Sequence, residues 1–169
     1  MILQTERLTL RPLRNEDVDD VFRLMSDVEV MAHWDTAEIE DPDVVAGIVQ
    51  AQVAANEAGA AFYWALVHDG FTMGLCDLSE IDRRHRRAEI GFMLGGDAWG
   101  RGFGLEAMRA VVTHAASLGL KRLSARAHVG NERSEAILIT LGFEPEGYLR
   151  GHIQRGGERR DCRIYGLLL

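Results

Sequence analysis

The chain has 169 residues, of which 47% are hydrophobic and 27% charged, and its formal net charge is −7. These values are typical of one globular domain (residues 1–169) that is large enough to bury a core. No apolar run approaches the length of a membrane span, and the acidic N-terminal segment is unlike a signal peptide. We therefore expect a cytoplasmic protein with no membrane association.

The net charge indicates which binding partners suit the chain, and the two cysteines indicate its thiol and metal chemistry. An acidic chain is a poor match for nucleic acid and favours a cationic partner. Cys76 and Cys162 lie far apart and lack the spacing of metal ligands. We expect both to be reduced, buried thiols, and we expect no metal site.

The first part of the chain predicts one strand followed by two helices. Arg7–Leu13 alternates as a strand that proline closes. Asn15 is predicted to cap a helix whose first-turn acids are solvated. The segment from Ser26 to Glu40 has no clear period and is predicted to be a loop. Asp41-Pro42 then begins a second helix, which ends at Gly59.

Two aromatic and apolar segments follow, and they predict a hairpin. Ala61–His68 and the segment from Phe71 to Ile81 are expected strands, joined by the turn signal Asp69-Gly70. The alternation slips between Leu75 and Leu78, which indicates a bulge or bend there. The basic run 83–87 is expected to be a solvated hairpin tip rather than a phosphate contact.

The stretch Ala88–Gly119 predicts a strand, a glycine-rich turn and an amphipathic helix. Glycines between Gly95 and Gly104 allow close backbone approach, and the free amides at the helix start suit an anion such as a pyrophosphate. A P-loop would place Lys and Ser or Thr where Leu105 and Glu106 stand, so that motif is a poor match. The alternative is a purely structural role, in which the glycines form a tight turn before a capped helix.

The remaining elements complete a mixed sheet. A strand is expected over 120–129, a helix from the predicted N-cap Asn131 to Gly142, and two final strands over 143–151 and 159–169. The expected order is β-α-α-β-β-β-α-β-α-β-β, with about seven strands and about four helices. This order predicts an α+β fold.

Four segments, TERLTLRPLRNEDVDDVFRLMSD, AEIGFMLGGDAWGRGFGLEAM, NERSEAILITLGF and RRDCRIYGLLL, resemble N-acetyltransferases of the GNAT type. They are most similar to the RimJ/RimL-like branch, which acetylates protein N-termini. The resemblance implies the GNAT acyl-CoA N-acyltransferase fold, with a mostly antiparallel sheet, and acetyl-CoA as the donor. It implies that amides from about Arg101 to Leu105 hold the pyrophosphate. It also implies that the strands before and after the helix that follows the glycine-rich turn splay apart, which admits the pantetheine arm of CoA. The residues expected to bind CoA are Phe92, Met93, Leu94, Trp99, Gly100, Arg101, Gly102, Phe103, Gly104, Leu105, Asn131 and Ser134.

Acetyl transfer to an amine requires a base, because a primary amine is protonated at neutral pH. Glu89 is the candidate, on the strand that leads into the glycine turn and opposite the apolar face of that strand. An exposed carboxylate or an ion-pair partner of a nearby arginine is an equally weighted alternative. Asp77 and Glu80 are second choices, and His33 has a suitable unperturbed pKa.

The leaving thiolate requires a proton or a hydrogen bond. Many members of the superfamily have a tyrosine seven residues after the asparagine, where this chain has Leu138. Ser134 is the matching polar group, and hydrogen bonding to the thiolate is its expected role. Helix capping is the alternative role for Asn131 and Ser134, and it is compatible with CoA contact.

The sequence leaves several classes of amine acceptor open. Trp34, His33 and Asp77 are the expected substrate-binding residues, although an aromatic residue such as Trp34 more often fills the edge of a core. A peptide N-terminal α-amine is one acceptor class, and polyamines or aminoglycoside-like amines are another. A CoA-binding sensor without turnover is the hypothesis from a different class. A monomer and a homodimer both remain open.

Overall fold

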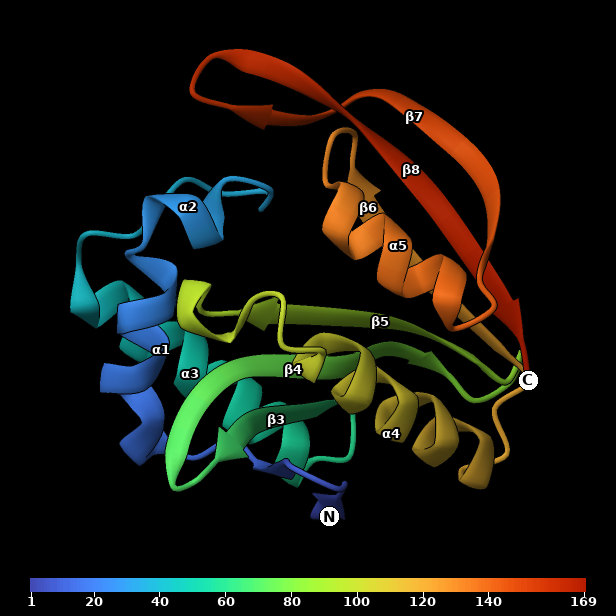
Figure 1. Cartoon of the computed structure of the whole chain (residues 1–169), viewed down its shortest axis with the longest axis horizontal. Helices are drawn as coiled ribbons and strands as arrows, with labels where there is room; N and C mark the ends of the chain where they lie inside the picture. Colours follow the sequence, from blue (N-terminus) through green and yellow to red (C-terminus); the bar gives the residue numbers. More distant parts are fainter.

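The computed structural model describes residues 1–169, and its centre is a single mixed sheet of eight strands (Figure 1). The order across the sheet is β1-β2-β3-β4-β5-β6-β8-β7, and β5–β6 is the one parallel pair. The strands are β1 (Leu3–Gln4), β2 (Thr9–Pro12), β3 (Phe62–His68), β4 (Phe71–Asp82), β5 (Arg87–Leu94), β6 (Arg122–His128), β7 (Glu144–Arg155) and β8 (Glu158–Leu168).

Helices cover both faces of this sheet. The helices are α1 (Val18–Met25), α2 (Val28–Met31), α3 (Pro42–Glu57), α4 (Phe103–Ser117) and α5 (Glu132–Thr140), with 3-10 turns at Asn15–Asp17 and Gly96–Ala98. Helices α1 and α3 pack with one buried cluster that includes Val21, Val45 and Ala65. Helices α4 and α5 pack with a larger cluster on the opposite face, which includes Phe103 and Leu138. None of these helices is long and apolar enough to cross a membrane.

The expected element order is confirmed, with two additions. The sheet gains β1, and α2 lies inside the segment predicted to be a loop. A two-residue strand and a four-residue helix are too short for a periodic pattern to reveal. The caps at Asp41 and Asn131 are confirmed, since each side chain accepts an amide of the following turn.

Two local expectations are wrong. Asn15 lies within the 3-10 turn and does not cap α1, which begins at Val18. The nearby acid Asp17 is buried rather than solvated, because both of its oxygens accept from the Arg11 guanidinium at 2.6 and 2.7 Å. Such a buried carboxylate requires a partner, and the strand before the helix provides it.

The predicted irregularity in β4 lies elsewhere. Leu75 to Leu78 pair regularly with β3, and the register shifts fall on either side of them, near Met73 and Glu80. Glu80 has a φ of +50°, a left-handed conformation that is uncommon for residues other than glycine. The Asp69-Gly70 hairpin turn is confirmed, with positive φ at both residues.

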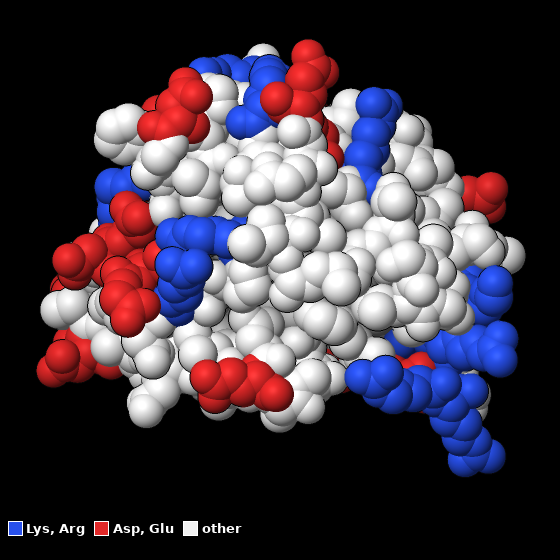
Figure 2. All heavy atoms as spheres, turned by 90° about the horizontal axis from the view of Figure 1, so that it is seen from below, with Lys and Arg blue, Asp and Glu red and all other residues white.

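The basic segment after β4 is exposed throughout, as a solvated tip would be. On the face shown in Figure 2, the largest group of basic side chains lies at one end, and most acidic side chains lie toward the other end, on the side of α1 in Figure 1, with some basic side chains among them. The middle of this face is largely uncharged.

The sheet opens in its middle. Strands β5 and β6 pair only from Arg87–Arg122 to Glu89–Ser124, although each strand continues for four or more residues beyond that point. The predicted separation of the strands flanking α4 is thus confirmed. The space between the diverging strands is called the gap below.

The buried centre of the sheet predicts a large effect of side-chain truncation. Leu66 of β3 is fully buried in the larger cluster, with 0% exposure. We expect Leu66→Ala to lower the free energy of unfolding by about 3 kcal/mol, because it leaves a cavity in a close-packed core. Urea denaturation followed by circular dichroism measures the change. Leu168→Ala, at a side chain that is 78% exposed, is the control and should change stability by less than about 0.5 kcal/mol.

Candidate active site

The glycine-rich turn presents a row of free backbone amides. Gly100 and Gly102 have φ of +71° and +80°, and α4 begins directly after Gly102. None of the amides of residues 100 to 105 donates to a protein oxygen, and the next bonded amide is Glu106 N to Gly102 O at 3.1 Å. Free amides at the positive end of a 15-residue helix can hold a phosphate or pyrophosphate.

The N-terminal segment braces this turn. Arg7 Nη1 donates to Arg101 O at 2.9 Å, and Arg7 Nε donates to Glu106 Oε2 at 2.7 Å. Thr5 Oγ1 donates to the other oxygen of Glu106 at 2.6 Å. No local sequence pattern reveals these contacts, because they join residues about 100 positions apart.

A cavity of about 770 Å³ lies against the glycine turn and reaches α5. Trp99 forms part of its wall, where Nε1 donates to Leu94 O at 2.9 Å and the Arg133 guanidinium lies 4.6 Å from the ring centroid. The lining includes every residue predicted for CoA except Arg101, namely Phe92, Met93, Leu94, Trp99, Gly100, Gly102, Phe103, Gly104, Leu105, Asn131 and Ser134.

The start of α5 forms the opposite wall. Asn131 Oδ1 accepts from Ser134 N at 3.2 Å, which is the capping role. The Ser134 hydroxyl makes no hydrogen bond to the protein, so it is free to donate into the cavity. Leu138, one turn further on, is buried and apolar.

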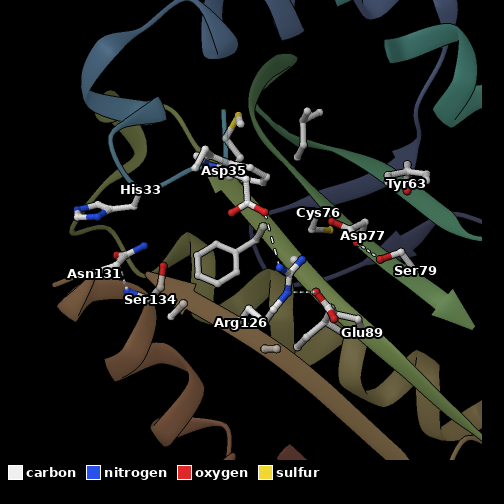
Figure 3. Close-up of a pocket in the computed structure, with 18 of the residues that line it drawn as sticks. His33, Asp35, Tyr63, Cys76, Asp77, Ser79, Glu89, Arg126, Asn131 and Ser134 are labelled. Atoms are coloured by element: carbon white, nitrogen blue, oxygen red, sulfur yellow. Dashed lines mark hydrogen bonds and ion pairs between the residues drawn. The ribbon is translucent and has the colours of Figure 1, made fainter. Parts of the chain in front are cut away.

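A second cavity of about 410 Å³ continues through the gap to the α1–α3 side of the sheet. Figure 3 shows its polar side chains, which come from β3, β4, β5, β6, α5 and the loop after α2. The two cavities share six lining residues, which are His33, Trp34, Phe92, Met93, Asn131 and Ser134. A molecule held at the glycine turn can therefore extend into the second cavity.

Asp77 of β4 lies at the inner end of this second cavity. Its Oδ2 accepts from Ser79 Oγ at 2.8 Å, and burial raises the pKa of the carboxyl to about 6. Gly91 is its neighbour on β5, and a Cβ there would lie 2.6 Å from Asp77 Oδ1. The glycine thus makes room for the carboxylate. Tyr63 of β3 stands beside it, and burial and Asp77 raise the pKa of the phenol.

Glu89 lies on the same face, at the closed end of the gap. Arg126 Nε donates to Glu89 Oε1 at 3.1 Å, so the ion-pair alternative is present. Arg126 Nη1 also lies 3.7 Å from Asp35 Oδ2, and Asp35 Oδ1 lies 2.8 Å from His128 Nε2. Figure 3 shows Arg126 between the two carboxylates.

Of the other predicted residues, some line the two cavities and some lie outside them. His33 and Trp34 line both cavities, and Trp34 also packs against the smaller core cluster, so its two alternatives coincide. Burial, followed by the nearby His128, lowers the pKa of His33. Glu80 is exposed and lines only a neighbouring hollow that it shares with Glu89. The cysteines are both buried and free, and no group of three acidic, His or Cys side chains forms a metal site.

Sequence reasoning missed Asp35, Tyr63, Arg126 and His128. A signal existed for two of them, because Arg126 and His128 share the polar face of a strand whose other face is apolar. No local pattern indicated that this face borders a cavity.

Comparison with known proteins identifies the family. Residues 7–144 match the family model described as an acetyltransferase (GNAT) domain. The chain is 29% identical to Uncharacterized N-acetyltransferase YoaA of Bacillus subtilis (strain 168), over 99% of this chain and 96% of that protein. It is 32% identical to Uncharacterized N-acetyltransferase p20 of Bacillus licheniformis, over 98% and 95%. It is 28% identical to the spermidine N(1)-acetyltransferase of Escherichia coli (strain K12), over 90% and 81%.

Solved structures agree on the fold. The crystal structure of "Probable acetyltransferase" superposes with a TM-score of 0.90 at 27% identity, over 99% of this chain and 97% of that one. RimL, the ribosomal L7/L12 alpha-N-protein acetyltransferase, in complex with coenzyme A superposes with a TM-score of 0.89 at 19% identity, over 100% and 98%. The chain belongs to the GNAT family and is an acetyl-CoA-dependent N-acetyltransferase with RimL-like proteins among its structural neighbours.

Proposed function

We propose that the chain transfers the acetyl group of acetyl-CoA to a primary α-amine, most simply the N-terminus of a peptide or protein. The observation that carries this proposal is the continuous path from the free amides of residues 100–105, through the gap, to the carboxyl of Asp77. One end of this path suits a pyrophosphate and the other end suits an ammonium ion. A module that only bound CoA would have no use for the second half.

In this proposal the glycine turn and the start of α5 hold the donor. The free amides of residues 100–105 bind the pyrophosphate. The space for the pantetheine arm of CoA is lined by Phe92, Met93 and Leu94 of β5. When bound, acetyl-CoA supplies the activated acetyl thioester. The Ser134 hydroxyl donates to the departing sulfur, which as a thiolate accepts such a bond readily.

Strand β5 supplies donors for the carbonyl oxygen. In an antiparallel pair, alternate residues bond to the partner strand and the others direct their N–H and C=O groups away from it. Beyond Glu89 the groups that turn away from β4 point into the gap, because β6 no longer pairs there. Such an amide stabilises negative charge that develops on the acetyl oxygen.

Asp77 is the base that the geometry favours. The pKa of about 6 lies near neutrality, so the carboxylate forms at physiological pH and is basic enough to accept a proton from the amine. The free amine then forms the N–C bond, the C–S bond breaks, and the second proton lost from the nitrogen leaves with the CoA thiolate as its thiol. Glu89 already pairs with Arg126, which balances its charge; its role as the base stays a prediction.

The basicity of Asp77 also favours an α-amine. An α-amino group has a pKa of about 7.7–8.0, whereas a lysine-like amine has a pKa of about 10.4. Proton transfer to a carboxylate of pKa about 6 therefore costs about 3 to 4 kcal/mol less from an α-amine.

A polyamine is the second candidate acceptor, and one feature favours it. A hollow lined by Glu80 and Asp82, together with Arg83 and Arg87, adjoins the second cavity and shares Tyr63, Ser79 and Glu89 with it. A second ammonium of a long diamine could lie there. The relative from Escherichia coli named above is a spermidine acetyltransferase.

An acceptor panel tests the proposal directly. Peptides with free N-termini, spermidine, spermine and an aminoglycoside would be compared by release of CoA and by mass of the product. We expect a peptide α-amine to give the highest kcat/KM. Faster turnover of a polyamine would select the second candidate, and no turnover with any amine would refute both.

Asp77→Asn tests the base. The amide keeps the shape and the bond to Ser79 but cannot accept the proton, so we expect kcat to fall by about 10²- to 10⁴-fold. Affinity for CoA, measured by calorimetry, should stay within about twofold, because Asp77 lies away from the glycine turn. Asp69→Asn, at the exposed tip of the β3–β4 hairpin, is the control. A kcat for Asp77→Asn equal to that of the wild type would remove Asp77 from the mechanism.

The same substitution predicts a pH-dependent gain in stability. The folded pKa of about 6 lies above the reference value of 3.8, so folding stability falls as pH rises from about 4 to 6 and stays lower above that range. We expect Asp77→Asn to raise the free energy of unfolding by about 2 kcal/mol at pH 7.5 and to leave it nearly unchanged at pH 4. Urea denaturation at both pH values measures this. An equal effect at the two values would contradict the burial of a carboxylate.

A further inference from the structure

A loop crosses the open side of the gap and joins the two halves of the sheet. It covers residues 32–38, after α2, and carries His33 and Trp34, which line both cavities. This loop belongs to the N-terminal half, but its side-chain and backbone partners lie in β6, β7 and β8. It is called the acceptor loop below.

Four side chains connect the acceptor loop to β6 and β5. Asp35 of the loop binds His128 at 2.8 Å and lies 3.7 Å from the Arg126 guanidinium. Arg126 in turn donates to Glu89 of β5 at 3.1 Å. We call Glu89, Arg126, Asp35 and His128 the clasp. The clasp spans the gap just beyond the last paired residues of β5 and β6, where ladder hydrogen bonds are absent.

The partners within the clasp are specific. A carboxylate can only accept, so His128 Nε2 carries the proton that it shares with Asp35. His128 is buried, and its other ring nitrogen has no partner, so Asp35 supplies the single hydrogen bond of this imidazole. Arg126 Nη1 also lies 3.2 Å from His152 Nε2 of β7. Arg126 therefore touches β5, the loop and β7 together.

A second set of contacts holds the backbone of the loop from the β7–β8 hairpin. Arg155 donates to Met31 O and to Trp34 O, and its Nη2 lies 3.3 Å from Glu38 Oε2. Arg160 donates to Ala32 O at 3.0 Å. These contacts hold the backbone at Ala32 and Trp34 and the side chain of Glu38, whereas Asp35 connects the loop to β6.

We propose that Asp35 and Arg126 are positioning residues for the acceptor: they hold the acceptor loop across the gap, so that His33 and Trp34 form the wall against which the amine is placed. The proposal rests on the proposed function, because it assigns the second cavity to the acceptor. Neither residue takes part in proton transfer. Without the clasp the loop keeps its contacts with the β7–β8 hairpin but loses its connection to β6, and the acceptor is held less closely.

The charges of the clasp separate this role from simple attraction of a cation. Arg126→Met adds one negative charge to the net charge of the cavity, and Asp35→Asn removes one. If the clasp acted only through its field, a cationic acceptor would bind more tightly to Arg126→Met and more weakly to Asp35→Asn. If the clasp positions the acceptor loop, acceptor binding is weaker than in the wild type in both variants.

The experiment compares Arg126→Met, Arg126→Lys and Asp35→Asn with the wild type, using the best acceptor of the panel. We expect the acceptor KM to rise about tenfold in Arg126→Met. We expect a several-fold rise in Asp35→Asn, because the amide oxygen can still accept from His128 Nε2 but no longer carries the charge that attracts the Arg126 guanidinium. Arg126→Lys keeps the charge but not the fork of donors, so it should restore part of the loss. Affinity for CoA should change by less than about twofold.

Arg122→Met is the matched control. Arg122 lies on the same strand, is 35% exposed against 38% for Arg126, and pairs with Glu146 at 2.8 Å outside the cavities. Both substitutions remove an arginine and break an ion pair, but only Arg126 touches the acceptor loop. The control should keep the acceptor KM of the wild type.

Hydrogen exchange supplies a readout that does not depend on turnover. Amides of residues 32–38 should exchange faster in Arg126→Met and Asp35→Asn than in the wild type or Arg122→Met. Opposite signs of the KM changes, an unchanged acceptor KM, or unchanged loop exchange in the two variants would each overturn the proposal. A wild type that binds CoA but acetylates no amine would instead refute the proposed function, and the exchange result would still test whether the clasp holds the loop.

Discussion

The structure depends on a sheet that loses its hydrogen-bond ladder in the middle. Strands β5 and β6 are joined at only three residue pairs, and each then continues without the other. Backbone groups that face this gap have no strand partner, which is costly unless water or a ligand satisfies them. In the proposed function a thioester and its amide-rich arm satisfy these groups, which would make the defect in the ladder the donor site as well. Beyond these three pairs, the two halves of the sheet are held together by α4 and α5 on one face and by the clasp on the other.

In the proposed function, the two faces of the sheet separate the two substrates. Alternation along β5 turns Ala88, Ile90 and Phe92 toward α4, while Glu89 and Gly91 face the side of α1 and α3. The donor would come from the α4 side, where the helix dipole and free amides favour its negative charge. The amine would meet the carboxylates on the other side. The gap is the one place where the two faces communicate, which explains why reacting groups on separate faces can meet.

Most of the fold could be predicted from the sequence, because local signals and the resemblance agree. The glycine turn, the Asp69-Gly70 hairpin and the cap at Asn131 each depend on a residue type with a specific conformational role. What could not be predicted are contacts between distant segments, such as Arg7 with Glu106 or Asp35 with His128. Residues of this kind look like ordinary surface charges until the topology places them together, and no periodicity records such pairings.

Two carboxylates of the same face illustrate why position in the sequence does not decide a chemical role. Glu89 stands on the strand that leads to the glycine turn, yet an arginine neutralises it at 3.1 Å. Asp77 stands one strand further from the gap, and its hydrogen-bond partner is the uncharged hydroxyl of Ser79. Burial without a cation partner raises the pKa of Asp77, whereas the Arg126 guanidinium already balances the charge of Glu89. In the proposed mechanism the uncompensated acid, Asp77, is therefore the one suited to take a proton from an ammonium ion. The pairing with Arg126 therefore does more than stabilise Glu89, because it leaves Asp77 as the acid of the cavity whose charge an incoming ammonium ion can balance.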